Sequence, residues 1–248
     1  MGKKYLLPLI FLVLYCFSAV GQIEVAQSSH YNWFDKLVGI ENTGIYDGIA
    51  YVETQRTINE KTKFFKSQDY LKGSIIYNGQ PHFDLDMKYN IFGDQLLLKL
   101  EDRLGGITLQ LFKDKISRFT IDGHRFMKIV PENSDEDMSG FYEIVLQREN
   151  FDLLVKHIKR EFIRKDRSSI YYEFINQKNE NLLVYQDTFY KLESKKDLVD
   201  LFPDLKKEIN KFYSTARRLR NSNPDEFMKA LITRLDILLS QKNNASAE

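Results

Sequence analysis

The chain has 248 residues, a formal net charge of +1 and 29% charged residues. Such a near-neutral protein has no global field to draw it onto nucleic acid, which excludes a general nucleic-acid-binding role. One cysteine, Cys16, excludes a framework of intrachain disulfides. Aromatic residues make up 13% of the chain and occur in alternating runs, which favours strands.

The first 21 residues have the features of a secretory signal peptide. Lys3 and Lys4 form a positive start, residues 5–20 are nearly all apolar, and small residues precede the cleavage site. The apolar run is shorter than the roughly 20 residues that a membrane span needs. Cleavage removes Cys16 and both lysines, so we expect a cysteine-free mature chain with a formal charge of −1 and no transmembrane span. The protein is therefore expected to be exported, whether periplasmic, outer-membrane-associated or secreted.

Residues 22–193 are expected to form a β-rich domain. Short runs of alternating apolar and polar residues are separated by turn signals, which predicts an antiparallel meander with one wet face. The pattern is compatible with a curved sheet, a sandwich or a partial barrel. The expected strands are residues 45–55, 61–66, 73–77, 83–89, 95–100, 107–112, 116–121, 125–130, 141–147, 169–175, 182–185 and 189–192.

The clearest hairpin signal lies between residues 73–77 and 83–89. Asn78 and Gly79 separate the two runs, and this pair supplies the positive φ angles of a type I′ turn. Strict alternation predicts that the second strand has one apolar face, which packs in the core, and one charged face. The apolar face is Phe83, Leu85, Met87 and Tyr89, and the charged face is Asp84, Asp86 and Lys88.

Two later segments depart from the simple strand pattern. Residues 131–139 are polar and acidic, which predicts a loop. Residues 151–165 fit helical spacing through Leu154, Ile158 and Phe162, and they also alternate. We favour a long strand, because residues 169–175 follow closely and can pair back with it, while a helix remains the alternative.

Residues 194–241 are expected to form a helical segment that packs on or beside the β-rich domain. Ser194 followed by Asp197 is typical of a helix start, and Pro203 ends that short helix. Residues 204–220 carry one apolar stripe and predict a single amphipathic helix. Asn223 before a proline predicts the start of a last helix, and residues 242–248 are expected to be a disordered tail. With the meander, these helices make an α+β fold.

Several motifs together resemble a family of uncharacterised exported proteins from Gram-negative bacteria. They are residues 73–80 (GSIIYNGQ), 87–92 (MKYNIF), 119–126 (FTIDGHRF), 140–143 (GFYE), 189–198 (FYKLESKKDL) and 205–209 (LKKEI). The resemblance covers roughly residues 46–212 and implies export and one shared architecture. It implies no activity, ligand or catalytic residue.

The catalytic candidates are Asp84, Asp86 and His124. Two carboxylates at alternate positions of a strand leave the same face, and such a pair can perform acid–base chemistry when the environments separate their pKa values. The alternative interpretation is a solvated hairpin face. His124, in the turn after Asp122-Gly123, could act as a general base, or it is an ordinary turn residue.

No metal site or cofactor is expected. His30, His82 and His157 are scattered without ligand spacing, and residues 135–137 (DED) lack the spacing and glycine of a calcium loop. Gly105-Gly106 lacks the rest of a phosphate-binding motif, and the nucleophile motifs of hydrolases are missing from the sequence.

A basic stretch, residues 156–220, holds 16 Lys and Arg against 10 Asp and Glu. Its densest part, Arg217, Arg218 and Arg220, is expected in the last turn of a helix, where cations favour the helix dipole. Such a patch could contact a polyanion, a lipid or an envelope partner, or it is an ordinary charged surface.

Three functions remain open on this sequence. The first is a non-enzymatic envelope module that binds an apolar ligand or a partner, for which a curved sheet crossed by a helix provides a groove. The second is a hydrolase whose acids converge only in three dimensions. The third is an assembly factor that acts through the basic helices.

Overall fold

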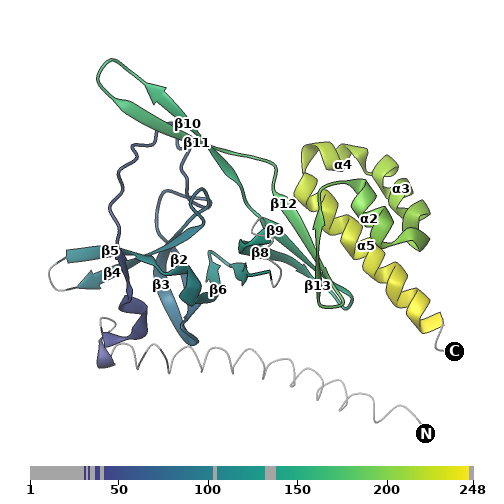
Figure 1. Ribbon diagram of the computed structural model, residues 1–248, viewed down its shortest axis with the longest axis horizontal. Coiled ribbons are helices and arrows are strands. Elements are labelled where there is room, and N and C mark those ends of the chain that lie inside the picture. Colours follow the sequence, from purple (N-terminus) through teal and green to yellow (C-terminus); the bar gives the residue numbers. More distant parts are fainter. Residues whose placement is uncertain are drawn as a thin grey trace, which may run out of the picture.

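The computed structural model describes residues 31, 33, 37–39, 42–102, 105–131 and 138–245. An open antiparallel sheet of 11 strands runs through the molecule in the order β1-β5-β4-β3-β2-β6-β7-β8-β9-β12-β13, and helices gather at the β13 end (Figure 1). The expected α+β class, an antiparallel meander followed by helices, is confirmed. The strands are β1 (Gly48–Ala50), β2 (Leu71–Tyr77), β3 (Gln80–Asn90), β4 (Gln95–Asp102), β5 (Gly105–Leu111), β6 (Ile116–Ile121), β7 (His124–Ile129), β8 (Gly140–Gln147), β9 (Phe151–Lys156), β12 (Glu180–Tyr185) and β13 (Thr188–Leu192).

The tight turns of the meander follow from local residue chemistry. Asn78 and Gly79 join β2 to β3 with φ angles of 49° and 79°, as a type I′ turn requires. Asp122 and Gly123 join β6 to β7 in the same way, with φ of 49° and 76°. Because these turns are only two residues long, consecutive strands pair with each other, and the meander is set by short-range signals.

The predicted faces of β3 are wrong at one position. The pairing shifts by one residue between Gly73 and Ile75, and Asp84 has a φ of 55°, so β3 carries a bulge there. Leu85 and the apolar residues after it face the core as expected, but the extra residue sends Phe83 to the opposite face and buries His82. The alternating pattern fails here because one unpaired residue moves the side chains before it to the opposite face of the sheet.

The two strands expected near the N-terminal part are mostly irregular. Of residues 45–55 only β1 pairs, with β5, and residues 61–66 contribute a single bridge from Phe64 to Asn90. The chain after β1 instead leaves the sheet and runs along a separate hairpin, where Tyr172 donates its backbone N–H to Arg56 at 2.9 Å. The alternating pattern therefore indicates an extended, partly buried segment that is mostly not hydrogen-bonded into a sheet.

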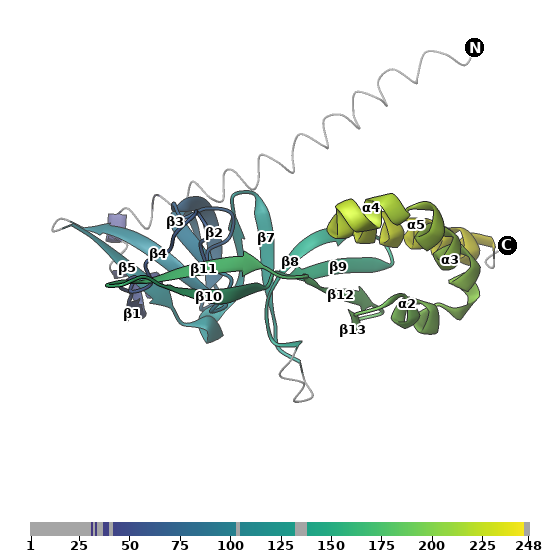
Figure 2. The same cartoon turned by 90° about the horizontal axis from the view of Figure 1, so that it is seen from above.

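Residues 151–165 are extended, as favoured, but they form two strands. β9 stays in the large sheet, whereas β10 (Lys159–Lys165) pairs with β11 (Ile170–Asn176) in a two-stranded sheet of its own. The break falls at His157 and Ile158. We call the β10–β11 hairpin the arm; it projects away from the large sheet in Figure 1, and seen from above it runs over the part of the sheet that holds β1 and β5 (Figure 2).

The helices are α2 (Lys195–Leu201), α3 (Lys206–Thr215), α4 (Arg217–Ser222) and α5 (Pro224–Ala245). Asp197 accepts the backbone N–H of Ser194 at 2.7 Å and fixes the start of α2 as expected. The single helix expected over residues 204–220 is wrong, because Ala216 leaves helical geometry between α3 and α4. The disordered tail expected from residue 242 is wrong for residues 242–245, since α5 continues to Ala245.

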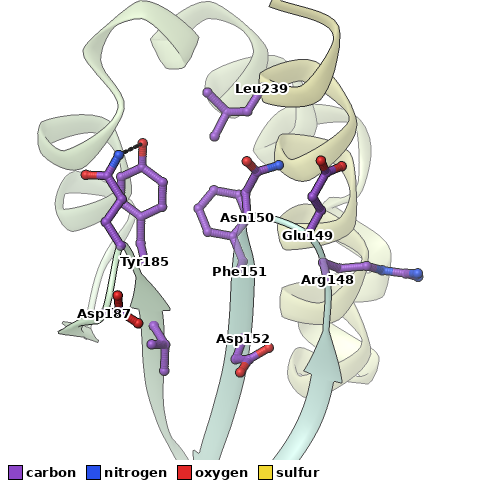
Figure 3. Close-up of a pocket in the computed structure, with 10 residues that line it drawn as sticks. Arg148, Glu149, Asn150, Phe151, Asp152, Tyr185, Asp187 and Leu239 are labelled. Carbon is purple, nitrogen blue, oxygen red and sulfur yellow. Dashed lines mark hydrogen bonds between the residues drawn. The ribbon is translucent and has the colours of Figure 1, made fainter. Parts of the chain in front are cut away.

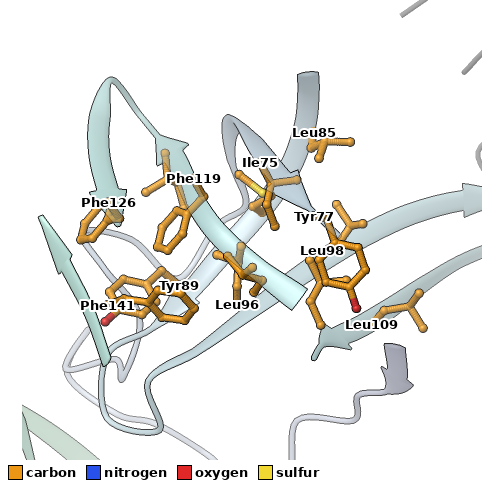
Figure 4. Close-up of a cluster of buried hydrophobic side chains, with 14 of the residues drawn as sticks. Ile75, Tyr77, Leu85, Tyr89, Leu96, Leu98, Leu109, Phe119, Phe126 and Phe141 are labelled. Carbon is orange, nitrogen blue, oxygen red and sulfur yellow. The ribbon is translucent and has the colours of Figure 1, made fainter. Parts of the chain in front are cut away.

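The sheet and helices enclose two main hydrophobic clusters. The larger one lies under the β2–β7 part, where Tyr89, Phe119, Phe126 and Phe141 pack ring against ring (Figure 4). The second joins β9, β12 and β13 to the helices around Leu231 and its neighbours. Burial of these apolar surfaces is the main force that stabilises the fold.

Some predictions fall on residues that the structure does not describe. The signal peptide with Cys16, His30, residues 135–137 and residues 246–248 lie outside the described part of the chain. Within the described part, no helix is both long and apolar enough to cross a membrane.

Candidate functional site

A cleft of about 720 Å³ lies where the large sheet, the arm and the helices meet, and we call it the junction cleft. It is built by the irregular segment before β2, the break between β9 and β10, the end of β11 and the start of α5. The residues that line it are 60–62, 65–66, Ile91, 157–159, 174–179 and 224–225. Such a volume is typical of sites for small molecules.

Lys159 is the most unusual charged group in the junction cleft. Its Nζ donates to the backbone oxygens of Thr62 and Phe64, both at 2.7 Å. Burial lowers the pKa of Lys159 to about 8, since a half-buried ammonium loses hydration. The ammonium has three N–H groups, and the two carbonyl oxygens accept two of them. The third N–H can therefore donate to another acceptor. The group is therefore suited to receive an anion.

Next to Lys159, the floor of the junction cleft is apolar. Phe65 and Phe174 are 6% and 2% exposed, and Ile91 lies between their segments. Phe174 also packs its ring against Phe92 at 5.2 Å between centroids. A cation beside buried rings matches a ligand that joins an acidic group to an apolar body.

Behind the floor, one carboxylate joins two histidines. Glu143 on β8 bonds His124 Nδ1 through Oε1 and His157 Nε2 through Oε2, each at 2.6 Å. Phe65 packs against both imidazole rings, edge to face with His124 at 5.1 Å and tilted with His157 at 5.3 Å between ring centroids. Because His157 occupies the break between β9 and β10 and lines the cleft, this His–Glu–His cluster fixes the cleft wall to the sheet.

Glu143 makes the cluster sensitive to acid. Burial alone would raise the pKa of Glu143, but the hydrogen bonds from His157 and His124 outweigh it and hold this pKa below its ordinary value. A lowered folded pKa contributes stability above the unfolded value of about 4.3, and this contribution is lost as the pH falls through the folded pKa.

We therefore expect Glu143→Gln to lower the free energy of unfolding by about 1–3 kcal/mol at neutral pH, because an amide cannot accept from both rings. The difference from the unmodified protein should shrink as the pH falls below about 4. Urea unfolding of both proteins across this range measures it. A difference that stays constant with pH would show that the carboxylate charge does not stabilise the fold.

The remaining charges of the junction cleft are mostly basic and engaged in ion pairs. Lys61 lies 3.4 Å from Glu173, and Lys66 lies 2.9 Å from Asp122. Lys178 adds a further exposed cation at the rim, and Glu60 and Asp225 oppose it. Because Lys61 and Lys66 are paired with acids, the preference of the cleft for an anionic ligand rests on Lys159.

The chemical possibilities of this site are binding and acid–base work by His157. The lining contains no serine or cysteine, and Thr62 accepts the backbone N–H of Phe64 at 3.2 Å. Across the residues that the structure describes, no group of three His, Cys, Asp or Glu could hold a metal ion. Lys159, with its lowered pKa, is the lining side chain with the most nucleophilic character, and the structure shows it bonded to two backbone oxygens.

Asp84 and Asp86, proposed from the sequence, do not converge with His124. Asp86 forms an ion pair with Lys72 at 3.0 Å, and the backbone oxygen of Asp84 accepts from the same lysine at 3.3 Å. In the sheet, β2 and β6 separate β3 from the β7 strand that carries His124. Of the three candidates, the structure brings only His124 to the His–Glu–His cluster.

The arginine cluster also lies away from the junction cleft. Arg217 and Arg218 begin α4 instead of ending a long helix, so the expected benefit from the helix dipole is wrong for them. Arg220 lies over the ring of Tyr213 at 5.5 Å. None of the three arginines is among the residues that line the cleft.

Sequence reasoning missed Lys159 and Glu143 and placed no weight on His157. Lys159 and His157 lie within residues 151–165. The only local signal there was a pattern that fits both a helix and a strand. Their partners are 14 to 97 residues away in the chain, so no short motif could have joined them.

Two other hollows lie elsewhere on the described part of the molecule. One, of about 400 Å³, lies between the β8–β9 turn, the β12–β13 turn and α5 (Figure 3). There Asn150 donates its backbone and side-chain N–H groups to Asp236 at 3.0 and 2.9 Å, which fastens the turn to α5. This hollow is lined by both positive and negative side chains. The hydrogen bonds of Asn150 hold the fold together there, which is a structural role.

The other hollow is an open groove of about 760 Å³ on the sheet face that Phe83 reaches through the bulge. Ile76 and Pro81 supply more apolar surface, and Arg118 and Arg125 supply charge. Both arginines are exposed, so water and salt screen them more than the half-buried Lys159. The junction cleft is therefore the better candidate.

Comparison of the chain with protein-family models, with curated proteins and with solved structures found no match.

Proposed function

We propose that this protein is a non-enzymatic, exported binding module of the cell envelope, and that it binds an anionic ligand with an apolar body in the junction cleft. The observation that carries the proposal is Lys159, a half-buried ammonium whose bonded partners are two backbone oxygens. The apolar floor around Phe65 and Phe174 supports the second property of the ligand.

Burying the charge of Lys159 costs free energy. An ammonium in a partly dry site is stable only when paired or well hydrogen-bonded, and two neutral carbonyl oxygens compensate part of that cost. A carboxylate or phosphate at the third N–H adds a charge-assisted hydrogen bond, which is about twice as strong as a neutral one. Binding and the protonation of Lys159 are therefore coupled.

The apolar part of the ligand would lie against the apolar floor of the cleft. Contacts with Phe65, Ile91 and Phe174 remove apolar ligand surface from water, which contributes about 25 cal/mol per Å². A fatty acid or another lipid-derived acid has both parts in one molecule. Such molecules are abundant in an envelope, and the N-terminal signal features support delivery of the protein to that compartment.

We expect Lys159→Met to weaken binding of a fluorescent fatty acid by about 10- to 100-fold, because a hydrogen bond to a charged group is lost. Affinity of the unmodified protein should fall as the pH rises through about 8, where Lys159 loses its proton. Fluorescence titration measures both effects, and the alcohol with the same chain should bind equally to both proteins.

Lys128→Met is the matched control, because Lys128 has a side chain 14% exposed and lies on β7 beside Asp114. It should leave fatty-acid affinity unchanged. Equal affinity of the Lys159→Met and unmodified proteins would overturn the proposal. Native mass spectrometry of protein purified from the envelope then reports the natural ligand and the removal of residues 1–21.

A hydrolase is the second candidate, and one observation favours it: His157 lines the cleft and its Nε2 is bonded to Glu143. A histidine oriented by a carboxylate is the usual arrangement of a general base. Turnover of a fatty-acid ester that is lost in His157→Gln would replace the binding proposal with this one.

A further inference from the structure

The base of the arm lines the junction cleft, but its tip, residues 163–170, lies outside the lining of that cleft. The arm is the only part of the described β structure outside the large sheet, and its tip extends beyond the neighbouring strands in Figure 1. Its base is held by backbone hydrogen bonds. The N–H of Tyr172 donates to the backbone oxygen of Arg56, and that of Phe174 to the backbone oxygen of Lys61, each at 2.9 Å. The tip, residues 163–170, has no such support and is free to contact a partner.

The arm tip presents apolar side chains to solvent. Ile163 and Ile170 are 54% and 51% exposed. The register pairs Ile163 with Tyr172 and Lys165 with Ile170, so the two isoleucines are diagonal neighbours on one face of the ribbon. Together the two side chains form an apolar surface at the end of the hairpin, which contact with an apolar phase would cover.

Cations surround these isoleucines. Lys165 and Arg167 are exposed at the tip, and Arg164 lies beside them. Arg164 is paired with Glu173 at 3.2 Å. Asp166 accepts the backbone N–H of Arg167 at 2.6 Å and keeps its charge. Residues 163–170 hold three cations and one acid, so the formal charge of the tip is +2.

We propose that the arm tip docks on an anionic phospholipid surface. The isoleucines would enter the boundary between headgroups and acyl chains, and Lys165 and Arg167 would lie among the phosphates. Apolar residues flanked by Lys and Arg are the usual composition of such interfacial elements, and long basic side chains reach outward to the headgroups. A narrow hairpin tip is also much smaller than the roughly 800 Å² per partner of a stable protein interface.

The test is sedimentation of the full chain without residues 1–21 with vesicles of phosphatidylcholine, with and without phosphatidylglycerol. We expect binding to the anionic vesicles alone and a loss of binding at high salt. Lys165→Gln with Arg167→Gln should lower the partition coefficient by about 30-fold, which corresponds to about 1 kcal/mol per basic residue. Ile163→Ser with Ile170→Ser should lower it by about tenfold.

Two matched pairs of substitutions serve as controls. Arg217→Gln with Arg218→Gln removes two exposed charges from α4, and Val52→Ser with Ile237→Ser removes two exposed apolar side chains outside the arm. Both should leave vesicle binding unchanged. The tip variants should retain fatty-acid affinity in the junction cleft, so the two proposals succeed or fail separately.

Three results would overturn the inference. Binding to neutral vesicles as strong as to anionic ones would remove the charge argument, and binding lost in the α4 variant but kept in the tip variants would move the contact to the helices. A dimer in sedimentation velocity that the isoleucine variant abolishes would identify the tip as a contact between copies of the chain.

Discussion

Met87→Asp is expected to lower the free energy of unfolding by about 4 kcal/mol or more, because it places an unpaired charge in the centre of the larger core. Met87 is 0% exposed and pairs across the sheet with Leu71 on β2 and Leu98 on β4. The surrounding cluster consists of buried aliphatic and aromatic side chains. Total stabilities of domains are about 5–15 kcal/mol, so this loss leaves little margin.

The comparison uses urea unfolding at neutral pH with two controls. Met87→Leu should cost less than about 1.5 kcal/mol, since the volume is nearly kept. Ile163→Asp, on the exposed arm, should cost less than about 1 kcal/mol. If Met87→Asp unfolded at the same urea concentration as the unmodified protein, the core face of β3 would have been assigned to the wrong side.

Gly73→Ala is the second large effect, with an expected loss of about 3 kcal/mol or more. A Cβ atom at Gly73 would lie 2.1 Å from the backbone oxygen of Thr120 and 2.4 Å from Cε of Met87. The methionine can move, but the Thr120 oxygen belongs to the β2–β6 ladder, so the strands would have to separate. The position is sterically closed even to one methyl group.

Gly106→Ala is the matched control on β5, where the nearest atom to an added Cβ is 3.5 Å away. Ordinary contact there predicts a change within about 0.5 kcal/mol, or slight stabilisation through the unfolded chain. Thermal and urea unfolding of the two variants measures the difference. Equal stabilities would mean that the sheet relaxes at Gly73 without cost.

The meander could be predicted because its determinants are local. Asn78-Gly79 and Asp122-Gly123 supply the positive φ angles that a two-residue turn needs, and the alternating runs on either side then pair with each other. The starts of α2 and α5 were predicted for the same reason, since Glu226 donates its backbone N–H to Asn223 at 3.1 Å.

Prediction failed where a distant partner decides the conformation. The bulge at Asp84 reverses Phe83 and depends on the pairing of β3 with β2. The break at His157 lets β10 leave the large sheet, and the irregular chain around Arg56 follows the arm instead of forming a strand. Alternation cannot detect these changes, because an extended chain alternates whether or not it is paired.

The sequence by itself determined an antiparallel sheet with helices after it, because turn residues and apolar periodicity act over a few positions. Only the tertiary structure decided where charge and apolar surface meet. Lys159 reaches the oxygen of Thr62 across 97 residues, and Glu143 joins His124 of β7 to His157 at the break after β9. Burial and hydrogen-bond partners set the properties of these groups, and both arise only when the chain is folded.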